Sequence, residues 1–367
     1  MDRRDFLRSA GMAAAGLATP GSRSSFAASS SPDGWRTFEI VTRAEVLEPA
    51  GGTRIWIPVP LVAETPYQKA MATTFKAEGG AARLVLDKSL DAVGVVAAEF
   101  PSGVKPALTV TSRASTRNHD VDFALPRRVP RRDRVALGHF LRPTKLLPID
   151  GVVRDRARVI VGAARSDEDK ARAIYDWIVD NTFRDPKVRG CGRGDIRSML
   201  ETGNLGGKCA DLNALYVGLA RASGLPARDV YGIRTAKSEL GFKSLGPATP
   251  TITKAQHCRA EVYLAAYGWV PVDPADVRKV ALEEPPGNLT LDDAVVKRAR
   301  ARLFGSWEMN WVAYNFGHDV SLPGADSGPL EFLMYPQAET ARGRVDSLDP
   351  DGFRYEITAR EIGVAAS

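Results

Sequence analysis

The sequence predicts an α+β fold in which a mostly antiparallel β domain precedes a core of helices and strands. Up to about residue 111, β-branched and aromatic residues alternate in short runs that show no helical period. From about residue 166, helix-periodic segments come first and strand-like runs follow them. Helices and strands that are segregated along a chain in this way are typical of α+β architectures.

Four strand-like runs define the predicted N-terminal β domain. They cover residues 37–42, 53–60, 83–86 and 107–111, and a glycine-rich turn separates the first two. Short alternating runs of this kind predict a small antiparallel sandwich or sheet. The segment 120–147 is rich in proline and arginine, which is typical of a linker. We therefore assign residues 33–147 to an N-terminal β domain and its linker.

Residues 148–367 are predicted to form the core, with a C-terminal strand extension. Ser166 and Asp169 have the spacing of a capping box at a helix start. A second helix begins near Cys209 and ends before Gly224. The other predicted elements are strands at 229–233, 257–264 and 269–273, a helix at 291–303, and strands at 311–314, 330–335 and 353–357.

The composition indicates a folded protein of two domains with a mildly basic surface. The chain has 367 residues, 44% of them hydrophobic, and a formal net charge of +6. Arginines are dense at residues 126–134, but no aromatic side chains alternate with them. A nucleic-acid platform is therefore not expected, and a solvated connection between domains is the simpler interpretation.

The first 30 residues predict a twin-arginine signal peptide. Arg3 and Arg4 precede a small apolar stretch at residues 10–18, and residues 26–28 end in small side chains suited to cleavage. The apolar stretch is shorter than the ~20 residues that a membrane helix needs. We therefore expect a periplasmic protein with no membrane span once the signal is removed.

Cys209 is the strongest candidate for a nucleophile. It follows Gly206, Gly207 and Lys208 at the start of a predicted helix. The positive end of a helix dipole and a neighbouring lysine both favour the thiolate. Thiol chemistry on an amide also needs a base and a group that orients that base.

His257 is the best base among four histidines, and Asp273 is the best group to orient it. If the strands on either side of residues 265–268 form a hairpin with a five-residue connection, Asp273 lies opposite Arg259. Asp273 then shares a face with His257 at a diagonal distance of about 7–8 Å. A four-residue connection would put the two on opposite faces unless a bulge intervened. The other histidines are His119, His139 and His318.

Three cysteines are an odd count for an oxidising compartment. One disulfide and one free thiol is the simplest arrangement, and if Cys209 is the nucleophile, the possible pair is Cys191 with Cys258. No cofactor or metal is predicted. The segment ending at Lys208 lacks the spacing of a phosphate-binding loop, and the cysteines show no paired metal-ligand spacing.

Three blocks in order resemble the transglutaminase-like core, which has a papain-like fold and a Cys-His-Asp triad. They are residues 207–211 with the helix that follows, His257, and residues 269–274 (Trp-Val-Pro-Val-Asp-Pro), within about residues 165–280. The resemblance implies Cys209 as nucleophile, His257 as acid and base, and Asp273 as the residue that orients it. Gln256 and Lys208 are supporting candidates, with the N–H of Cys209, for an oxyanion hole.

The strand block 56–60 resembles the β domain that often precedes this core in exported bacterial members. Cys258 departs from the family, because an aromatic or small residue usually follows the histidine. A second thiol beside the base is compatible with a disulfide or with redox restraint of the site.

The predicted function is thiol-dependent acyl transfer on amide or peptide bonds, as in a cysteine peptidase or amidase. Its expected partner is a peptide or protein substrate, including the peptide part of peptidoglycan. One alternative is a non-catalytic module that binds peptide or cell envelope on the same fold, in which Cys209 is blocked and the triad does not converge. Others are a cross-linking transglutaminase and a basic structural protein of the envelope. The oligomeric state stays open.

Overall fold

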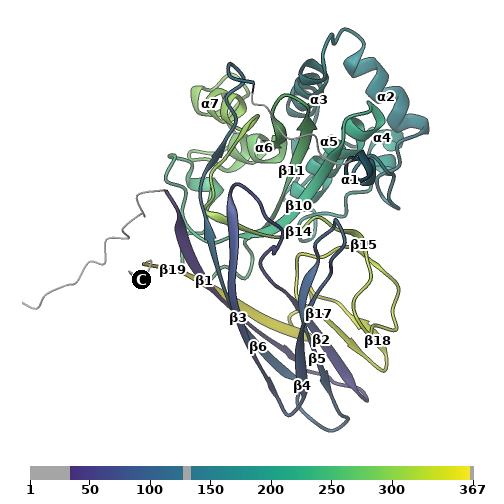
Figure 1. Ribbon diagram of the computed structural model, residues 1–367, viewed down its shortest axis with the longest axis vertical. Helices are drawn as coiled ribbons and strands as arrows, with labels where there is room; N and C mark the ends of the chain where they lie inside the picture. Colours follow the sequence, from purple (N-terminus) through teal and green to yellow (C-terminus); the bar gives the residue numbers. More distant parts are fainter. Residues whose placement is uncertain (1–33, 127–133, 364–367) are drawn as a thin grey trace, which may run out of the picture.

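The protein is an α+β molecule in which a β-sandwich carries a core of helices and one central sheet (Figure 1). The computed structural model describes residues 34–126 and 134–363. The predicted signal peptide at residues 1–30 and most of the arginine-rich run at 126–134 lie outside these residues. The predicted α+β class is confirmed, with strands first and helices packed around the later strands.

Two antiparallel sheets form the β-sandwich at the bottom of Figure 1. Apolar residues of both sheets, among them Ile55, Val96, Leu108 and Phe353, fill the space between them. One sheet has the order β19 (Phe353–Ile362), β1 (Arg36–Val46), β6 (Ala107–Thr116), β3 (Gln68–Glu78). The other has the order β18 (Gly343–Val345), β17 (Gln337–Thr340), β2 (Thr53–Pro58), β5 (Gly94–Phe100), β4 (Ala81–Leu86).

Strands β3 and β5 were not predicted. β3 is a mostly exposed edge strand that is rich in polar residues, so it lacks the alternation that marks a half-buried strand. β5 consists almost entirely of apolar residues, because both of its faces are covered, and it therefore lacks the alternation of a half-buried strand as well.

The C-terminal strands differ from the prediction. They were expected to extend the core, but β17 pairs with β2 and β19 pairs with β1 over ten residues of each strand. They thereby complete both sheets of the N-terminal β domain. Sequence patterns identify a strand but not its partner, and an unpaired edge accepts a strand from anywhere along the chain.

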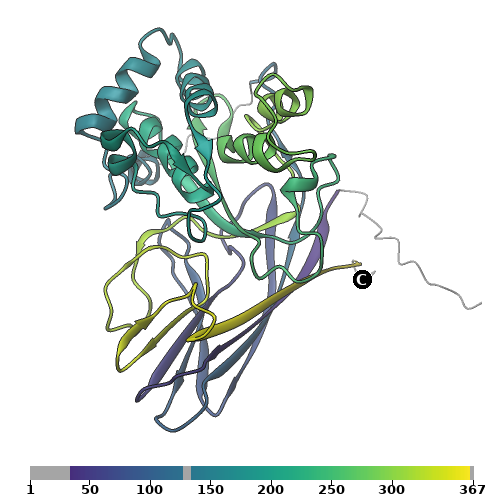
Figure 2. The same ribbon diagram turned by 180° about the vertical axis from the view of Figure 1, so that it is seen from behind.

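The core is built on a four-stranded antiparallel sheet. Its order is β12 (Gly268–Val272), β11 (Gln256–Leu264), β10 (Ala227–Arg234), β14 (Trp311–Asn315). Every residue of these strands is buried, because helix α5 (Cys209–Ala222) covers one face and the β-sandwich covers the other. Ile233 and Val312 pack against Phe38 and Ile40 of β1 across this boundary. Figure 2 shows the core and the β-sandwich from behind, with the helices on the side of the core away from the sandwich.

Further helices surround α5. The predicted capping box is confirmed, since the Asp169 N–H donates to Ser166 Oγ and the Ser166 N–H donates to Asp169. Helix α6 was missed, and it begins directly after Asp273 with a proline in its first turn. The helices are α1 (Arg134–His139), α2 (Gly151–Val161), α3 (Asp167–Asn181), α4 (Ile196–Thr202), α6 (Pro274–Glu283), α7 (Ala294–Arg302) and the short 3₁₀ turn η1 (Lys243–Leu245).

The remaining strands of the described residues form two-stranded sheets. The predicted linker contributes β7, which pairs with β13, as well as α1. The pairs are β7 (His119–Asp120) with β13 (Ser306–Trp307), β8 (Phe183–Arg184) with β9 (Gly206–Gly207), and β15 (His318–Val320) with β16 (Leu330–Phe332).

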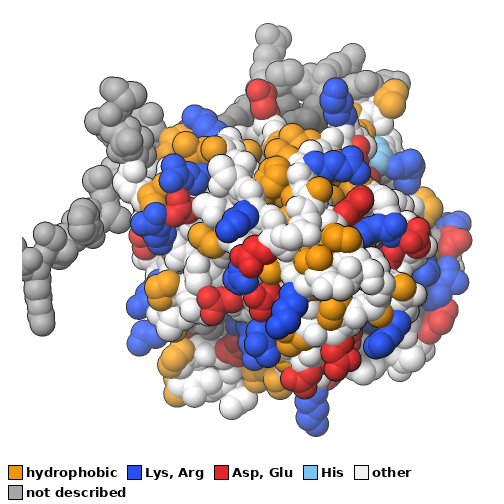
Figure 3. Space-filling model, turned by 90° about the horizontal axis from the view of Figure 1, so that it is seen from below, with side chains coloured by type: hydrophobic (Ala, Val, Ile, Leu, Met, Phe, Trp, Pro, Cys, Tyr) orange, Lys and Arg blue, Asp and Glu red, His pale blue; other side chains and the backbone are white. Residues whose placement is uncertain are grey.

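Positive and negative side chains are interspersed on the face seen from below in Figure 3. This face therefore shows no continuous basic surface for a polyanion. Among residues 34–126 and 134–363, no helix has the length and apolar character needed to cross a bilayer.

Candidate active site

Cys209 is the first residue of α5, and Asp211 holds the start of this helix in place. The Asp211 carboxylate accepts the N–H of Lys208 at 2.9 Å and the N–H groups of Arg193 and Gly194 at 2.9 and 3.0 Å. It thereby ties the loop before the helix to the first turn. Gly192 has a φ of +93°, and a Cβ there would lie 1.9 Å from an Asp211 oxygen. The glycine-rich sequence around Cys191 is explained by this close approach, and the role of Asp211 was not predicted.

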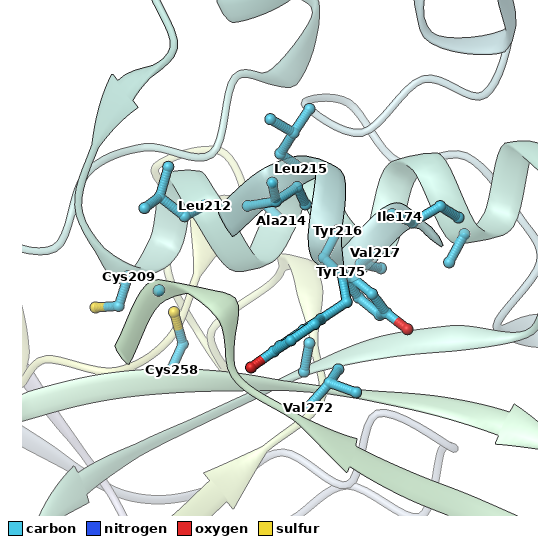
Figure 4. Packing of buried hydrophobic residues seen from close by; sticks show 14 of the residues in the cluster. Ile174, Tyr175, Cys209, Leu212, Ala214, Leu215, Tyr216, Val217, Cys258 and Val272 are labelled. Carbon is cyan, nitrogen blue, oxygen red and sulfur yellow. The ribbon is translucent and has the colours of Figure 1, made fainter. Parts of the chain in front are cut away.

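The three cysteines meet at this helix terminus, but no disulfide joins them. Cys191, Cys209 and Cys258 are each a free, buried thiol, so the predicted Cys191–Cys258 disulfide is wrong. Instead both thiols lie beside Cys209, and the Gln256 carbonyl, 3.4 Å from Cys191 Sγ, is a second acceptor within reach of the single Cys191 proton. Figure 4 shows the Cys258 side chain pointing from the sheet toward Cys209 at the N-terminal end of α5.

Hydrogen bonds to Cys209 favour its thiolate. The thiols of Cys191 and Cys258, and then His257, hydrogen-bond to the sulfur and lower its pKa well below the usual range, against the effect of burial. The hydrogen bond to Cys209 raises the pKa of Cys191, and burial raises that of Cys258. A negative charge in this cluster therefore resides on Cys209.

His257 and Asp273 meet, and the register is that of the five-residue connection, one of the two considered from the sequence. Strands β11 and β12 pair Ala260 with Val272, so the next residue, Asp273, comes opposite Arg259. The His257 ring nitrogen Nε2 lies 2.7 Å from Asp273 Oδ2. Because Nε2 is engaged by the carboxylate, Nδ1 is the ring nitrogen that remains for Cys209.

Besides His257, groups of α6 and α5 hold Asp273. It is fully buried and caps α6, with Oδ1 accepting the Asp276 N–H at 3.1 Å. Asn213 of α5 donates to the same oxygen at 3.2 Å and also to the Cys258 carbonyl at 2.9 Å. Asn213 was not predicted, although it lies one helical turn after Cys209 and therefore on the same helix face.

A second buried carboxylate, Asp276, faces the same imidazole. It lies 3.4 Å from His257 Nε2 and accepts Arg234 Nη2 at 2.6 Å. Burial and Arg234 lower the pKa of His257, but Asp276 and Asp273 outweigh them and raise it to about 10. The imidazolium is thus the stable form beside Cys209 at neutral pH. Asp276 and Arg234 were also missed, since nothing in their local sequence marks them.

The donor atoms of His257, Asp273 and Asp276 lie within 4.8 Å of one another, close enough for a metal ion. However, Arg234 pairs with Asp276, and Arg259 Nε lies 3.6 Å from Asp273. These guanidinium groups already supply the positive charge that a metal would bring. The donor set therefore fits an ion-pair network better than a metal centre.

The remaining histidines lie elsewhere, although two of them have carboxylate partners. His139 Nε2 is 2.7 Å from Asp91, and His318 Nε2 is 3.0 Å from Asp229. Among the described residues, neither makes a contact with a cysteine thiol. His119 lies in β7, and its ring centroid is 5.5 Å from that of Tyr67.

A cavity of about 240 Å³ gives access to Cys209 and His257. Two predicted supporting residues, Gln256 and Lys208, also line it. Gln256 is only 9% exposed, and its Nε2 has no hydrogen-bond partner within the described residues. An unpartnered buried amide donor on a residue that lines the cavity of the nucleophile is a candidate partner for a bound carbonyl oxygen.

Comparisons with known proteins agree with this core. Residues 154–274 match the core domain of the transglutaminase-like superfamily. An uncharacterised protein of Haemophilus influenzae is 33% identical over 342 residues, which are 89% of this chain and 91% of the relative.

Two solved structures are similar at lower levels. A candidate cysteine protease from Cytophaga hutchinsonii has 17% identity and a TM-score of 0.49, covering 89% of this chain and 98% of that one. The periplasmic domain of TgpA from Pseudomonas aeruginosa has 16% identity and a TM-score of 0.34, covering 64% and 89%. The assignment rests on the matched residues 154–274 and not on these two structures. Through this core, the chain belongs to the transglutaminase-like superfamily.

Proposed function

We propose that the protein is a thiol-dependent acyl-transfer enzyme that cleaves amide or peptide bonds, as a cysteine peptidase or amidase does. The observation that carries this proposal is the Cys209 thiol, whose pKa is lowered at a helix N-terminus beside His257, which in turn is held by Asp273. A nucleophile, a base and a group that orients the base are the minimum equipment for this chemistry.

In the proposed reaction, the Cys209 thiolate attacks the substrate carbonyl carbon, and a C–S bond forms as the carbonyl oxygen becomes an oxyanion. The N–H of Cys209, in the first turn of α5 where N–H groups lack helical acceptors, and Gln256 Nε2 are the donors available to that oxyanion. The His257 imidazolium then protonates the leaving amine as the C–N bond breaks. Water attacks the thioester next, with His257 accepting its proton, and hydrolysis releases the acid and Cys209.

The features expected of the non-catalytic alternative do not match the site. A binding module on this fold was expected to have a blocked Cys209 and groups that do not converge, whereas the thiol is free and His257 contacts Asp273. Cross-linking differs from hydrolysis only in the acceptor of the acyl group. Variants of Cys209 and His257 therefore test hydrolysis and cross-linking alike.

The pH dependence of Cys209 alkylation by iodoacetamide tests the proposal. The thiolate–imidazolium pair exists between the lowered pKa of Cys209 and the pKa of about 10 of His257. We expect half-maximal alkylation of Cys209 at a pH well below that of an ordinary cysteine, because its thiolate is stabilised. His257→Ala should move the midpoint to higher pH, because the imidazolium that stabilises the thiolate is lost.

Mass spectrometry of the alkylated peptide separates Cys209 from the other two thiols, whose pKa values are raised. Alkylation of Cys209 with an ordinary thiol midpoint that His257→Ala leaves in place would refute the enzymatic proposal.

We further propose that the protein works in the periplasm after twin-arginine export. The support is the order of signal elements in residues 1–30. Replacing both Arg3 and Arg4 with lysine should retain the protein in the cytoplasm of a Gram-negative host, because the export machinery reads the arginine pair. Immunoblots of periplasmic and cytoplasmic fractions measure this, with Arg8→Lys as the matched control. Equal export of the double variant and the control would contradict the proposal.

A further inference from the structure

The cavity next to Cys209 is strongly basic. Five lysine and arginine side chains line it besides His257, and none of its lining residues is an aspartate or glutamate. This differs from the face in Figure 3, where the two signs of charge are interspersed. The five are Arg184, Lys208, Arg234, Lys254 and Lys279.

Nearby carboxylates balance only part of this charge. Arg234 pairs with Asp276, whereas Arg184 and Lys279 share the single carboxylate of Glu283. Burial and the neighbouring Arg184 lower the pKa of Lys279, which is consistent with mutual repulsion of these cations. Within the described part of the chain, Lys208 and Lys254 form no ion pair.

The two unpaired lysines stand where this cavity meets a second one. Lys208 and Lys254 also line a neighbouring cavity of about 410 Å³, together with Cys191 and Gln256. The aromatic and apolar part of its lining comes from the C-terminal segment that completes the β-sandwich: Tyr335, Leu348, Phe353 and Tyr355. Arg189 and Arg354 line the same cavity and add to its positive charge. The cleft therefore offers positive positions close to the nucleophile and a partly apolar wall beyond them.

We propose that the acyl donor of this enzyme carries a carboxylate, as an acidic peptide does, and that Lys208 and Lys254 bind this carboxylate beside Cys209. The inference rests on the proposed thiol chemistry and deepens it to a substrate class. Unpaired cations in a partly enclosed cleft raise the local concentration of anions and select for them. A neutral substrate would leave both lysines without a partner.

Two alkylating probes that differ in charge test the inference at Cys209 itself. The ratio of the iodoacetate rate to the iodoacetamide rate, divided by the same ratio for free cysteine, removes the effect of thiol pKa. We expect this normalised ratio to be about 10 or more, because basic clefts accelerate anion association by that order. Lys208→Gln and Lys254→Gln should each lower it, and Lys254→Glu should lower it most. Lys88→Gln, on the exposed surface of the β domain, is the matched control and should not change it.

The carboxylate can come from an acidic side chain or from a C-terminal carboxyl group. Three peptides separate these sources: an acetylated tripeptide amide with a central glutamate, the same amide with a central glutamine, and the glutamine peptide with a free C-terminus. The measurement is how well each peptide protects Cys209 from alkylation by iodoacetamide. Better protection by either anionic peptide than by the neutral amide supports the inference and identifies the source.

If Cys209 is reactive but the normalised ratio is near 1, the inference is overturned and the thiol chemistry is unaffected. The same holds if neither anionic peptide protects Cys209 better than the neutral amide does. An unreactive Cys209 instead overturns the proposed function.

Discussion

Replacing Cys209 with alanine is expected to abolish turnover of peptide substrates, by about 10⁴-fold or more, the loss typical when a catalytic nucleophile is removed. The reason is that no other described thiol can take its place: Cys191 and Cys258 are buried, and their pKa values are raised. The initial rate of hydrolysis of a fluorescence-quenched peptide library measures the effect. Circular dichroism of the variant serves as the control for a retained fold.

Cys191→Ala and Cys258→Ala serve as matched variants, because each removes a thiol of the same cluster. Both thiols donate hydrogen bonds that lower the Cys209 pKa, so their loss should move the acid limb of the pH–rate profile to higher pH without abolishing turnover. If Cys191→Ala or Cys258→Ala were as inactive as Cys209→Ala at every pH, Cys209 would not be the sole nucleophile.

Replacing Asp276 with alanine is expected to lower the free energy of unfolding by about 3–5 kcal/mol, the usual cost of breaking a buried ion pair by removing one partner. Arg234 and Asp276 lie 2.6 Å apart, with side chains only 6% and 1% exposed. Without Asp276, the buried guanidinium retains only the Leu245 carbonyl at 2.8 Å as a hydrogen-bond acceptor. Urea denaturation followed by tryptophan fluorescence measures the loss.

The double variant Arg234→Met/Asp276→Leu should recover much of this stability, because it leaves no unpaired charge. An exposed pair provides the control: Arg158 and Asp155 are 72% and 75% exposed, so Arg158→Ala should change stability by less than about 1 kcal/mol. A loss for Asp276→Ala no larger than that of Arg158→Ala would contradict the role assigned to the buried pair.

Much of the site could be predicted because its signals are local. Cys209 follows a glycine-rich turn and begins a helix, and the five-residue hairpin connection, one of the two considered, puts Asp273 on the face of His257. Asn213 could have been found as well, since helical spacing puts it on the face of Cys209. By contrast, Asp276 and Arg234 come from different elements and meet only through the packing of α6 against the core, so no local pattern reveals them.

The sequence by itself determined the α+β class, the four strands of the core sheet, helix α5, and the three candidate residues Cys209, His257 and Asp273, because helix starts and strand alternation are short-range properties of a chain. Only the tertiary structure decided that three thiols share one site without a disulfide, and that C-terminal strands close the N-terminal sandwich. It also decided that the same C-terminal segment lines the cavity next to the basic cavity of Cys209. These features depend on contacts between residues far apart in the chain, which burial and strand pairing select and local sequence does not encode.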